Sequence, residues 1–122
     1  MGDRANVFMK GYQEEPGVFM YTHWSGYDLP VTVQRALQKQ WRWNDPQYLA
    51  RIIFCEMIKG QEDCEAGYGL SAVVGGGDYR VVQVDAYTQT VTFGKASGTL
   101  FIPEGNTYSF DEYVSLNLDG WE

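Results

Sequence analysis

This sequence is poor in the residues that catalytic and metal sites need most. Its 122 residues include one histidine, His23, and two cysteines, Cys55 and Cys64. Neither cysteine belongs to a CxxC or Cys/His spacing, and a single histidine excludes a His-rich metal centre. A Cys–His enzyme would have to use His23, and no cysteine occupies an exposed helix N-terminus, where a thiolate is favoured. We therefore expect two free thiols, no metal and no cofactor. The sequence leans against an enzyme without excluding one, and no catalytic residue is named.

Positive charge and long apolar runs are also scarce. The 16 acidic and 9 basic residues give a net charge of -7, so the domain repels phosphate backbones and nucleic acid is not an expected partner. No apolar run approaches the roughly 18 residues of a membrane span, and the first residues do not form a signal-type hydrophobic stretch. We expect a cytoplasmic protein with no membrane partner. Without repeats or linkers, residues 1–122 are expected to form a single domain.

Two helices are predicted in the centre of the chain, each by a start signal followed by an amphipathic pattern. Asp28 stands two residues before a proline, as an N-cap residue does, and apolar residues then recur on one face until about Gln40. Asp45 and the proline after it repeat this signal, residues 48–58 continue the helix, and Gly60 ends it. More than half of the circumference of the second helix is apolar, so we expect it to pack on two sides.

Strand-like segments lie on both sides of these helices. Residues 6–11 and 17–24 are separated by a Pro-Gly turn and predict a hairpin. Behind the helices, short connections between four segments predict an antiparallel meander of residues 67–74, 79–85, 89–93 and 99–102. The glycine groups of this region run into strands rather than into a helix N-terminus, which excludes a dinucleotide or phosphate-binding loop.

The end of the chain carries one more local signal. Ser109 and Glu112 have the S-x-x-E spacing of a capping box, which predicts a short helix through about Asn117. The complete pattern predicts an α+β fold. In this fold an antiparallel sheet, made of the N-terminal hairpin and the C-terminal meander, packs against the two central helices.

Glu56 is the residue that fits a plain core least. On a helical wheel it falls inside the apolar stripe of the second helix, next to Ile53 and Met57. A buried carboxylate has to be hydrogen-bonded, paired or protonated. The candidate partners are backbone donors at a strand end and three side chains, His23, Arg35 and Arg42.

Two interpretations of Glu56 follow. In the first it locks the sheet to the helix pair, or reaches solvent at the edge of the helix. In the second it lines a ligand pocket together with His23, whose strand leads directly into the first helix. The other residues of this candidate pocket are Trp24, Tyr48 and Arg51.

The connection between the helices carries the segment Trp41-Arg42-Trp43. In a purely structural interpretation one indole enters the core and Arg42 stacks over the other, a cation–π arrangement. In a functional interpretation the segment is an exposed Trp/Arg anchor of the kind that dominates protein interfaces. A short connection cannot easily bury both rings, so Trp41, Arg42 and Trp43 form the candidate interface.

Several segments together resemble small hypothetical proteins of prokaryotic and phage genomes. The segments are Tyr21-Thr22-His23-Trp24-x-Gly26, Arg42-Trp43-x-Asp45, residues 48–54 (YLARIIF) and Gly67-Tyr68-Gly69. The resemblance covers residues 18–93. It implies a phage or mobile-element setting, and it brings no activity or catalytic residue with it.

The aromatic content is the unusual feature of the composition. Four Trp, 9 Tyr and 6 Phe make up 16% of the chain, and some of these rings must lie near the surface, where Tyr and Trp favour contacts with partners. The leading hypothesis is a small non-catalytic interaction protein that binds a protein partner or itself.

Three alternatives to this hypothesis stay open. The acidic groups at 14–15, 62–65 and 111–112 could imitate nucleic acid toward a basic host protein, although such groups are typical of a solvated surface. A small-ligand binder or an enzyme could use His23 and Glu56. A purely structural domain is the third possibility.

Overall fold

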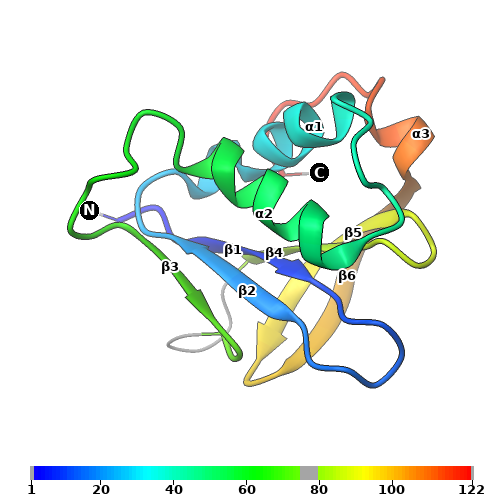
Figure 1. Ribbon diagram of the computed structural model, residues 1–122, viewed down its shortest axis with the longest axis horizontal. Coiled ribbons are helices and arrows are strands. Elements are labelled where there is room, and N and C mark those ends of the chain that lie inside the picture. Colours follow the sequence, from blue (N-terminus) through cyan, green and yellow to red (C-terminus); the bar gives the residue numbers. More distant parts are fainter. Residues whose placement is uncertain (1, 75–79, 122) are drawn as a thin grey trace.

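The computed structural model describes residues 2–74 and 80–121 of the chain. Within these residues, a six-stranded sheet of order β3-β2-β1-β4-β5-β6 carries helices α1 and α2 on one face (Figure 1). The predicted α+β class is confirmed. The elements, in chain order, are β1 Ala5–Met9, β2 Val18–Thr22, α1 Leu29–Gln38, α2 Pro46–Met57, β3 Tyr68–Ser71, β4 Arg80–Asp85, β5 Thr90–Ser97, β6 Leu100–Ser109 and α3 Phe110–Tyr113.

The sheet contains the predicted hairpin and meander, joined by a parallel pair that the sequence pattern did not predict. Strands β1 and β2 pair antiparallel, as do β4, β5 and β6 in turn. Strand β1 pairs with β4 in parallel, with Asn6 opposite Val81. Short turns force antiparallel pairing only between consecutive strands. Strands β1 and β4 are not consecutive, and both helices lie between β2 and β4 in the chain. The direction of β4 relative to β1 is therefore set by this long connection and not by a short turn.

The predicted strand at 67–74 forms, but in a different place from the one expected. It is shorter, Tyr68–Ser71, and pairs antiparallel with β2, with Gly69 opposite Tyr21. Strand β4 is already paired on both edges, with β1 and β5, whereas β2 has a free edge for β3. The predicted glycine turn at 75–78 lies outside the described residues.

Strand β5 extends through a segment that was predicted to interrupt the sheet, and β6 continues past its predicted end at residue 102 to Ser109. Residues 94–98 were expected to interrupt the sheet, yet β5 continues through Gly94 to Ser97. The register shifts between Thr92 and Gly94, and a Cβ at Gly94 would collide with the carbonyl oxygen of Ile102 on β6. The glycine therefore marks a bulge with close backbone approach rather than a strand end.

The two predicted N-caps before α1 and α2 behave differently. Asp45 is extended, and its side chain accepts hydrogen bonds from the backbone N–H groups of Gln47 and Tyr48, both at 3.2 Å. Asp28 precedes α1 but makes no side-chain cap bond. It belongs to a 3-10 turn and already has nearly helical backbone angles, whereas a capping side chain is normally presented from an extended residue.

The C-terminal helix begins as predicted and ends early. The capping box of Ser109 and Glu112 is present, but α3 stops at Tyr113 rather than near Asn117. The side-chain amide of Gln34 on α1 donates to the carbonyl oxygens of Tyr113 and Leu116, at 2.9 and 2.8 Å. These carbonyls are satisfied by another helix instead of by a further turn of α3.

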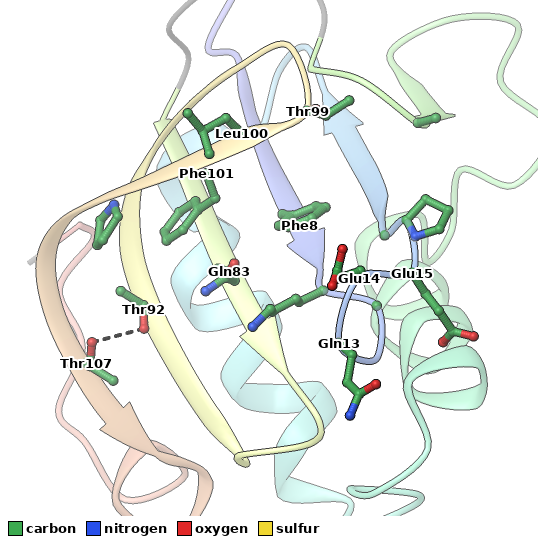
Figure 2. Close-up of a pocket in the computed structure, with 16 residues that line it drawn as sticks. Phe8, Gln13, Glu14, Glu15, Gln83, Thr92, Thr99, Leu100, Phe101 and Thr107 are labelled. Carbon is green, nitrogen blue, oxygen red and sulfur yellow. Dashed lines mark hydrogen bonds between the residues drawn. The ribbon is translucent and has the colours of Figure 1, made fainter.

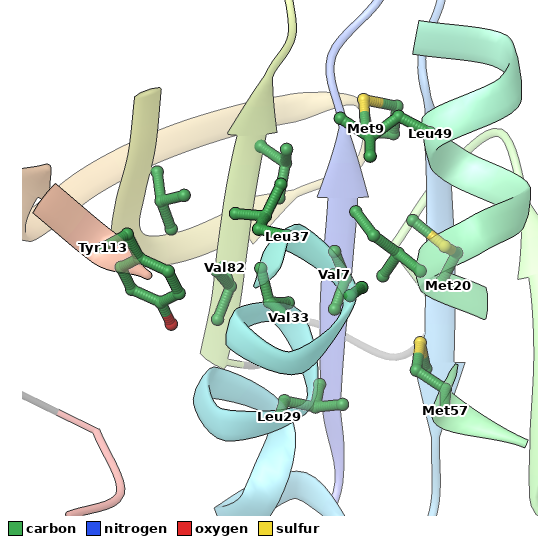
Figure 3. Close-up of a cluster of buried hydrophobic side chains, with 14 of the residues drawn as sticks. Val7, Met9, Met20, Leu29, Val33, Leu37, Leu49, Met57, Val82 and Tyr113 are labelled. Atoms are coloured by element: carbon green, nitrogen blue, oxygen red, sulfur yellow. The ribbon is translucent and has the colours of Figure 1, made fainter. Parts of the chain in front are cut away.

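The main core fills the space between the helices and the sheet (Figure 3). Aliphatic and sulfur-containing side chains dominate it, and Tyr113 closes one end. The buried residues labelled in Figure 3 are Val7, Met9, Met20, Leu29, Val33, Leu37, Leu49, Met57, Val82 and Tyr113. Among the described residues, no helix is long and apolar enough to cross a membrane.

Candidate functional site

The two tryptophans of the α1–α2 connection point in opposite directions. Trp43 packs inward, where its indole N–H donates to the carbonyl oxygen of Leu37 at 3.0 Å and its ring meets Phe110 edge-on at 5.3 Å. Trp41 is 58% exposed, and the Lys39 ammonium lies 5.1 Å from its ring centroid. The structural interpretation was right that one indole enters the core. Trp41 is the member of the pair that is free to act as an anchor.

Both chain neighbours of the exposed tryptophan have strained backbone conformations. Gln40 and Arg42, on either side of Trp41, have φ values of 59° and 56°. Left-handed backbone costs a non-glycine residue about 1–3 kcal/mol, and such residues cluster at functional positions. Neither residue is the glycine or asparagine that this conformation favours. The connection therefore keeps Trp41 turned outward at an energetic cost.

Arg42 and Arg51 lie beside this tryptophan with few partners of their own. The Arg42 guanidinium stacks over the Tyr48 ring at 4.4 Å, and so over a tyrosine and not over the indole that the sequence suggested. Arg51 donates to the thiol of Cys55 at 3.8 Å. Among residues 2–74 and 80–121, neither arginine has a carboxylate within ion-pair distance.

Glu56 has the partners that its position requires, but they are lysines. Its side chain is 10% exposed and forms ion pairs with Lys39 at 3.7 Å and Lys59 at 3.6 Å. Lys39 follows α1 and Glu56 belongs to α2, so the pair ties the end of α1 to α2. This arrangement supports the structural interpretation, with a helix-to-helix lock in place of the expected helix-to-sheet lock.

These residues form one continuous patch, which we call the basic-aromatic surface. Tyr48, Arg51 and Cys55 recur at i, i+3 and i+7 on α2 and so share one helix face, and Lys59 extends that face beyond the helix. The basic-aromatic surface consists of Lys39, Trp41, Arg42, Tyr48, Arg51 and Lys59. A hollow of about 100 Å³ lies within it, lined by Lys39, Trp41, Arg51, Ile52, Cys55, Glu56 and Lys59.

The structure brings two of the five residues of the candidate pocket, Glu56 and Arg51, to one hollow. His23 Nδ1 lies 2.9 Å from the Tyr21 hydroxyl, and the exposed Trp24 ring meets Tyr68 edge-on. No hydrogen bond or ion pair joins His23 to Glu56. Of the five predicted pocket residues, Glu56 and Arg51 line the same hollow, whereas His23, Trp24 and Tyr48 do not line it. These contacts give no support to chemistry shared by His23 and Glu56.

Sequence reasoning missed a larger feature on the opposite face of the sheet. A groove of about 720 Å³, the sheet groove, lies between the β1–β2 loop and the β5–β6 hairpin (Figure 2). Its floor includes Phe8, Gln83, Thr92 and Thr107 from four neighbouring strands. Strand alternation is the signal that could have placed these residues opposite the core, but their alignment depends on the β1–β4 pairing.

The acidic groups noted in the sequence lie on separate parts of the molecule. They belong to the β1–β2 loop, the α2–β3 loop and α3, which occupy three different corners in Figure 1. Dispersed carboxylates do not form the continuous charged face that imitation of nucleic acid requires.

Asp3 and Tyr113, which lie elsewhere, have shifted pKa values. The Tyr27 N–H and the Arg80 guanidinium bind the Asp3 carboxylate, at 2.8 and 2.5 Å, and lower the pKa of Asp3. Burial, with a smaller effect of Tyr108, raises the pKa of Tyr113. Cys55 and Cys64 are exposed free thiols, as expected. Within the described ranges, no three His, Cys, Asp or Glu side chains gather as metal ligands would.

Comparison with protein-family models, with curated proteins and with solved structures finds nothing that matches this chain. What the protein binds has to be inferred from its own surfaces.

Proposed function

We propose that this is a non-catalytic interaction protein, and that its basic-aromatic surface binds an acidic segment of a protein partner. The observation that carries the proposal is a local reversal of charge. Four of the chain's 9 basic residues lie around an exposed tryptophan there, and Glu56 is the one carboxylate among the described residues that line the hollow, although the chain as a whole has a charge of -7.

The residue types fit an interface. Trp, Tyr and Arg are the side chains most enriched among interface hot spots. Trp41 and Tyr48 are 58% and 49% exposed, so a partner that covers them removes a large apolar area from water. Both rings already have a cation against them, which keeps the cations near the positions where an acidic partner would meet them.

The arginines are the strongest candidates for direct contact. Lys39 and Lys59 share Glu56, whereas Arg42 and Arg51 have no ion pair within the described part of the chain. A guanidinium binds a carboxylate through two parallel hydrogen bonds, and such charge-assisted pairs are stronger than neutral ones. The hollow beside Arg51 leaves room for a carboxylate side chain.

The overall negative charge sharpens this recognition rather than preventing it. At physiological ionic strength, charges interact appreciably over about 8 Å, so a partner close to the surface experiences mainly the local cations. The rest of the chain holds 15 of the 16 acidic residues and 5 of the 9 basic residues, so its net charge repels an acidic partner. The charge distribution thereby favours one orientation of approach.

Binding of a fluorescein-labelled poly-glutamate peptide, measured by fluorescence anisotropy, tests the proposal. Arg51→Gln should weaken binding about 10- to 100-fold, because a hydrogen bond to a charged group contributes roughly 1.5–3 kcal/mol. Lys95→Gln is the matched control, since Lys95 lies on β5 and pairs with Glu104 there. Equal affinities for wild type and Arg51→Gln would refute the proposal.

The two exposed cysteines allow a second measurement on the same complex. Cys55 lines the hollow and Cys64 does not. Saturating poly-glutamate should slow alkylation of Cys55 and leave Cys64 unchanged, as peptide mass spectrometry can show. Equal protection of both thiols, or of neither, would place the peptide elsewhere.

A further inference from the structure

The face of the sheet away from the helices carries an ordered row of side chains. The backbone register aligns one residue from each strand, because Phe8 stands opposite both Phe19 and Gln83, and Thr92 stands opposite both Gln83 and Thr107. Figure 2 shows Phe8, Gln83, Thr92 and Thr107 following one another across the groove. The row changes from aromatic rings to an amide and then to two hydroxyl groups.

The sheet groove combines an apolar lining with negative charge. Phe8, Phe101, Leu100 and two prolines supply apolar surface. Glu14 and Glu15 line the groove from the β1–β2 loop. The single cation among its lining residues is Lys10, and an ion pair of 3.5 Å to Asp85 occupies it. The groove volume of about 720 Å³ is within the usual range of binding pockets.

One polar group on the groove floor has no partner. The Thr92 and Thr107 hydroxyl groups bind each other at 3.0 Å, but no described residue forms a hydrogen bond with the half-buried amide of Gln83. The groove therefore offers an amide donor and acceptor beside aromatic rings, with the Glu14 carboxylate close to Phe8.

We infer that the partner of the basic-aromatic surface is a second copy of this chain, docked into the sheet groove. The inference rests on the proposed function and names the partner. Trp41 is an exposed apolar side chain with the Lys39 ammonium near its ring and Arg42 as the next residue in the chain. The groove presents the opposite arrangement, an aromatic side chain on its floor and two acidic residues, Glu14 and Glu15, among its lining. Charge and apolar character thus match between two surfaces of the same molecule.

The two surfaces lie on different sides of the protein. The basic-aromatic surface belongs to the helical layer, whereas the groove opens on the uncovered face of the sheet (Figure 1, Figure 2). A copy that inserts its Trp41 into a neighbour leaves its own groove empty for a third copy. Such head-to-tail contacts are heterologous and produce a ring or an open chain of subunits rather than a closed twofold dimer.

Two complementary variants test this geometry. Glu14→Lys with Glu15→Lys disables the groove, and Arg42→Glu with Arg51→Glu disables the basic-aromatic surface. Circular dichroism first establishes that both are folded. In sedimentation velocity at low salt, the mass of the wild type should rise with concentration and fall again at high salt. Each variant alone should stay monomeric. Their equimolar mixture should form a dimer and nothing larger, because only one intact groove and one intact surface remain per pair.

Two milder substitutions check the contacts themselves. Trp41→Ala and Gln83→Ala should each weaken wild-type association, the first by at least about tenfold, because a buried indole is a typical hot spot. Lys95→Gln serves again as a control that leaves association unchanged. Unaltered association of Trp41→Ala would contradict the inference.

The failure of this inference is distinguishable from failure of the proposed function. A monomeric wild type that still binds poly-glutamate in an Arg51-dependent manner would overturn self-association and retain the proposed function. A monomeric wild type that binds poly-lysine in a manner dependent on Glu14 and Glu15 would assign the groove to a basic segment of another protein. A mixture of the two complementary variants that remains monomeric would also overturn the inference.

Discussion

On β4, Val82 and Val84 face the helices, whereas Gln83 between them faces the groove. On β1, Val7 and Phe8 divide in the same way. The helix-covered face carries the main core, and the open face carries a smaller buried apolar cluster beside the amide and hydroxyl groups of the groove floor. Successive residues of a strand alternate between faces, so one set of strands supports the core and presents a binding floor. Substitutions on the two faces should separate stability from association.

The largest expected effect is on the covered face. Leu49 is fully buried between α2 and the sheet. Leu49→Ala should lower the free energy of unfolding by about 2–5 kcal/mol, because it removes apolar contacts and leaves a cavity. Urea denaturation monitored by tryptophan fluorescence measures this change. A decrease of less than about 1 kcal/mol in the free energy of unfolding is typical of a solvated surface position. It would contradict the expectation that the covered face determines stability.

Tyr113 should give the next largest effect, since it is a polar group within the covered core. Its hydroxyl donates to the carbonyl oxygen of Pro30 at 2.6 Å. Tyr113→Phe should cost about 1–3 kcal/mol, because the buried carbonyl loses its donor. Urea denaturation at neutral pH is the measurement, and a neutral or stabilising change would contradict this account of the bond.

The same tyrosine predicts a pH dependence. Burial raises the pKa of Tyr113, so the folded state retains a proton that the unfolded chain releases near pH 10. Its contribution is therefore complete below pH 10 and declines as the pH rises above that value. The difference in unfolding free energy between wild type and Tyr113→Phe should shrink between about pH 9 and 11. Parallel stability curves would exclude the effect.

A smaller effect is expected where α2 begins. Asp45 accepts two backbone hydrogen bonds, and Asp45→Ala should cost about 0.5–2 kcal/mol. Asp28→Ala is a matched control, because that side chain makes no cap bond, and it should change stability by less than about 0.5 kcal/mol. Thermal unfolding followed by circular dichroism compares the two. Equal losses of stability in the two variants would mean that the hydrogen bonds of Asp45 contribute little to the stability of α2.

The smallest effect on stability should come from the open face. Gln83 has no hydrogen-bond partner among the described residues, so Gln83→Ala should change the free energy of unfolding by less than about 0.5 kcal/mol. The same variant should weaken self-association in sedimentation velocity. A large loss of stability with intact association would reverse the contrast drawn between the faces.

Local signals in the sequence predicted the elements whose causes are local. The Asp45-Pro46 start of α2 and the Ser109/Glu112 capping box both formed, because caps depend on residues within one helical turn. The need of Glu56 for a partner was also predictable from the apolar stripe around it. Lys59 lies three residues further on and could have been proposed. Lys39 lies at the end of α1, and choosing it over Arg35 on the same helix requires knowing how α1 packs against α2.

The features that failed to follow from the sequence depend on distant pairing or on unusual backbone. The position of β3 beside β2 and the parallel pairing of β1 with β4 depend on which strand edges are free to pair. The groove follows from that joint. Trp41 points outward and Trp43 inward in a connection where Gln40 and Arg42 have positive φ angles. Because neither residue is a glycine, nothing in the sequence indicated this backbone conformation.

The β1–β4 joint has a consequence for how the protein acquires its structure. It unites the two halves of the sheet by pairing Asn6 with Val81 and Met9 with Val84, residues that are far apart along the chain. Non-local contacts slow folding, because an extensive loop must close before they are made. Until β4 arrives, the first strand of the chain exposes an unpaired edge of the kind that aggregates. We expect the pairing of β1 with β4 to limit the folding rate. We also expect it to limit the protein concentration at which refolding proceeds without aggregation.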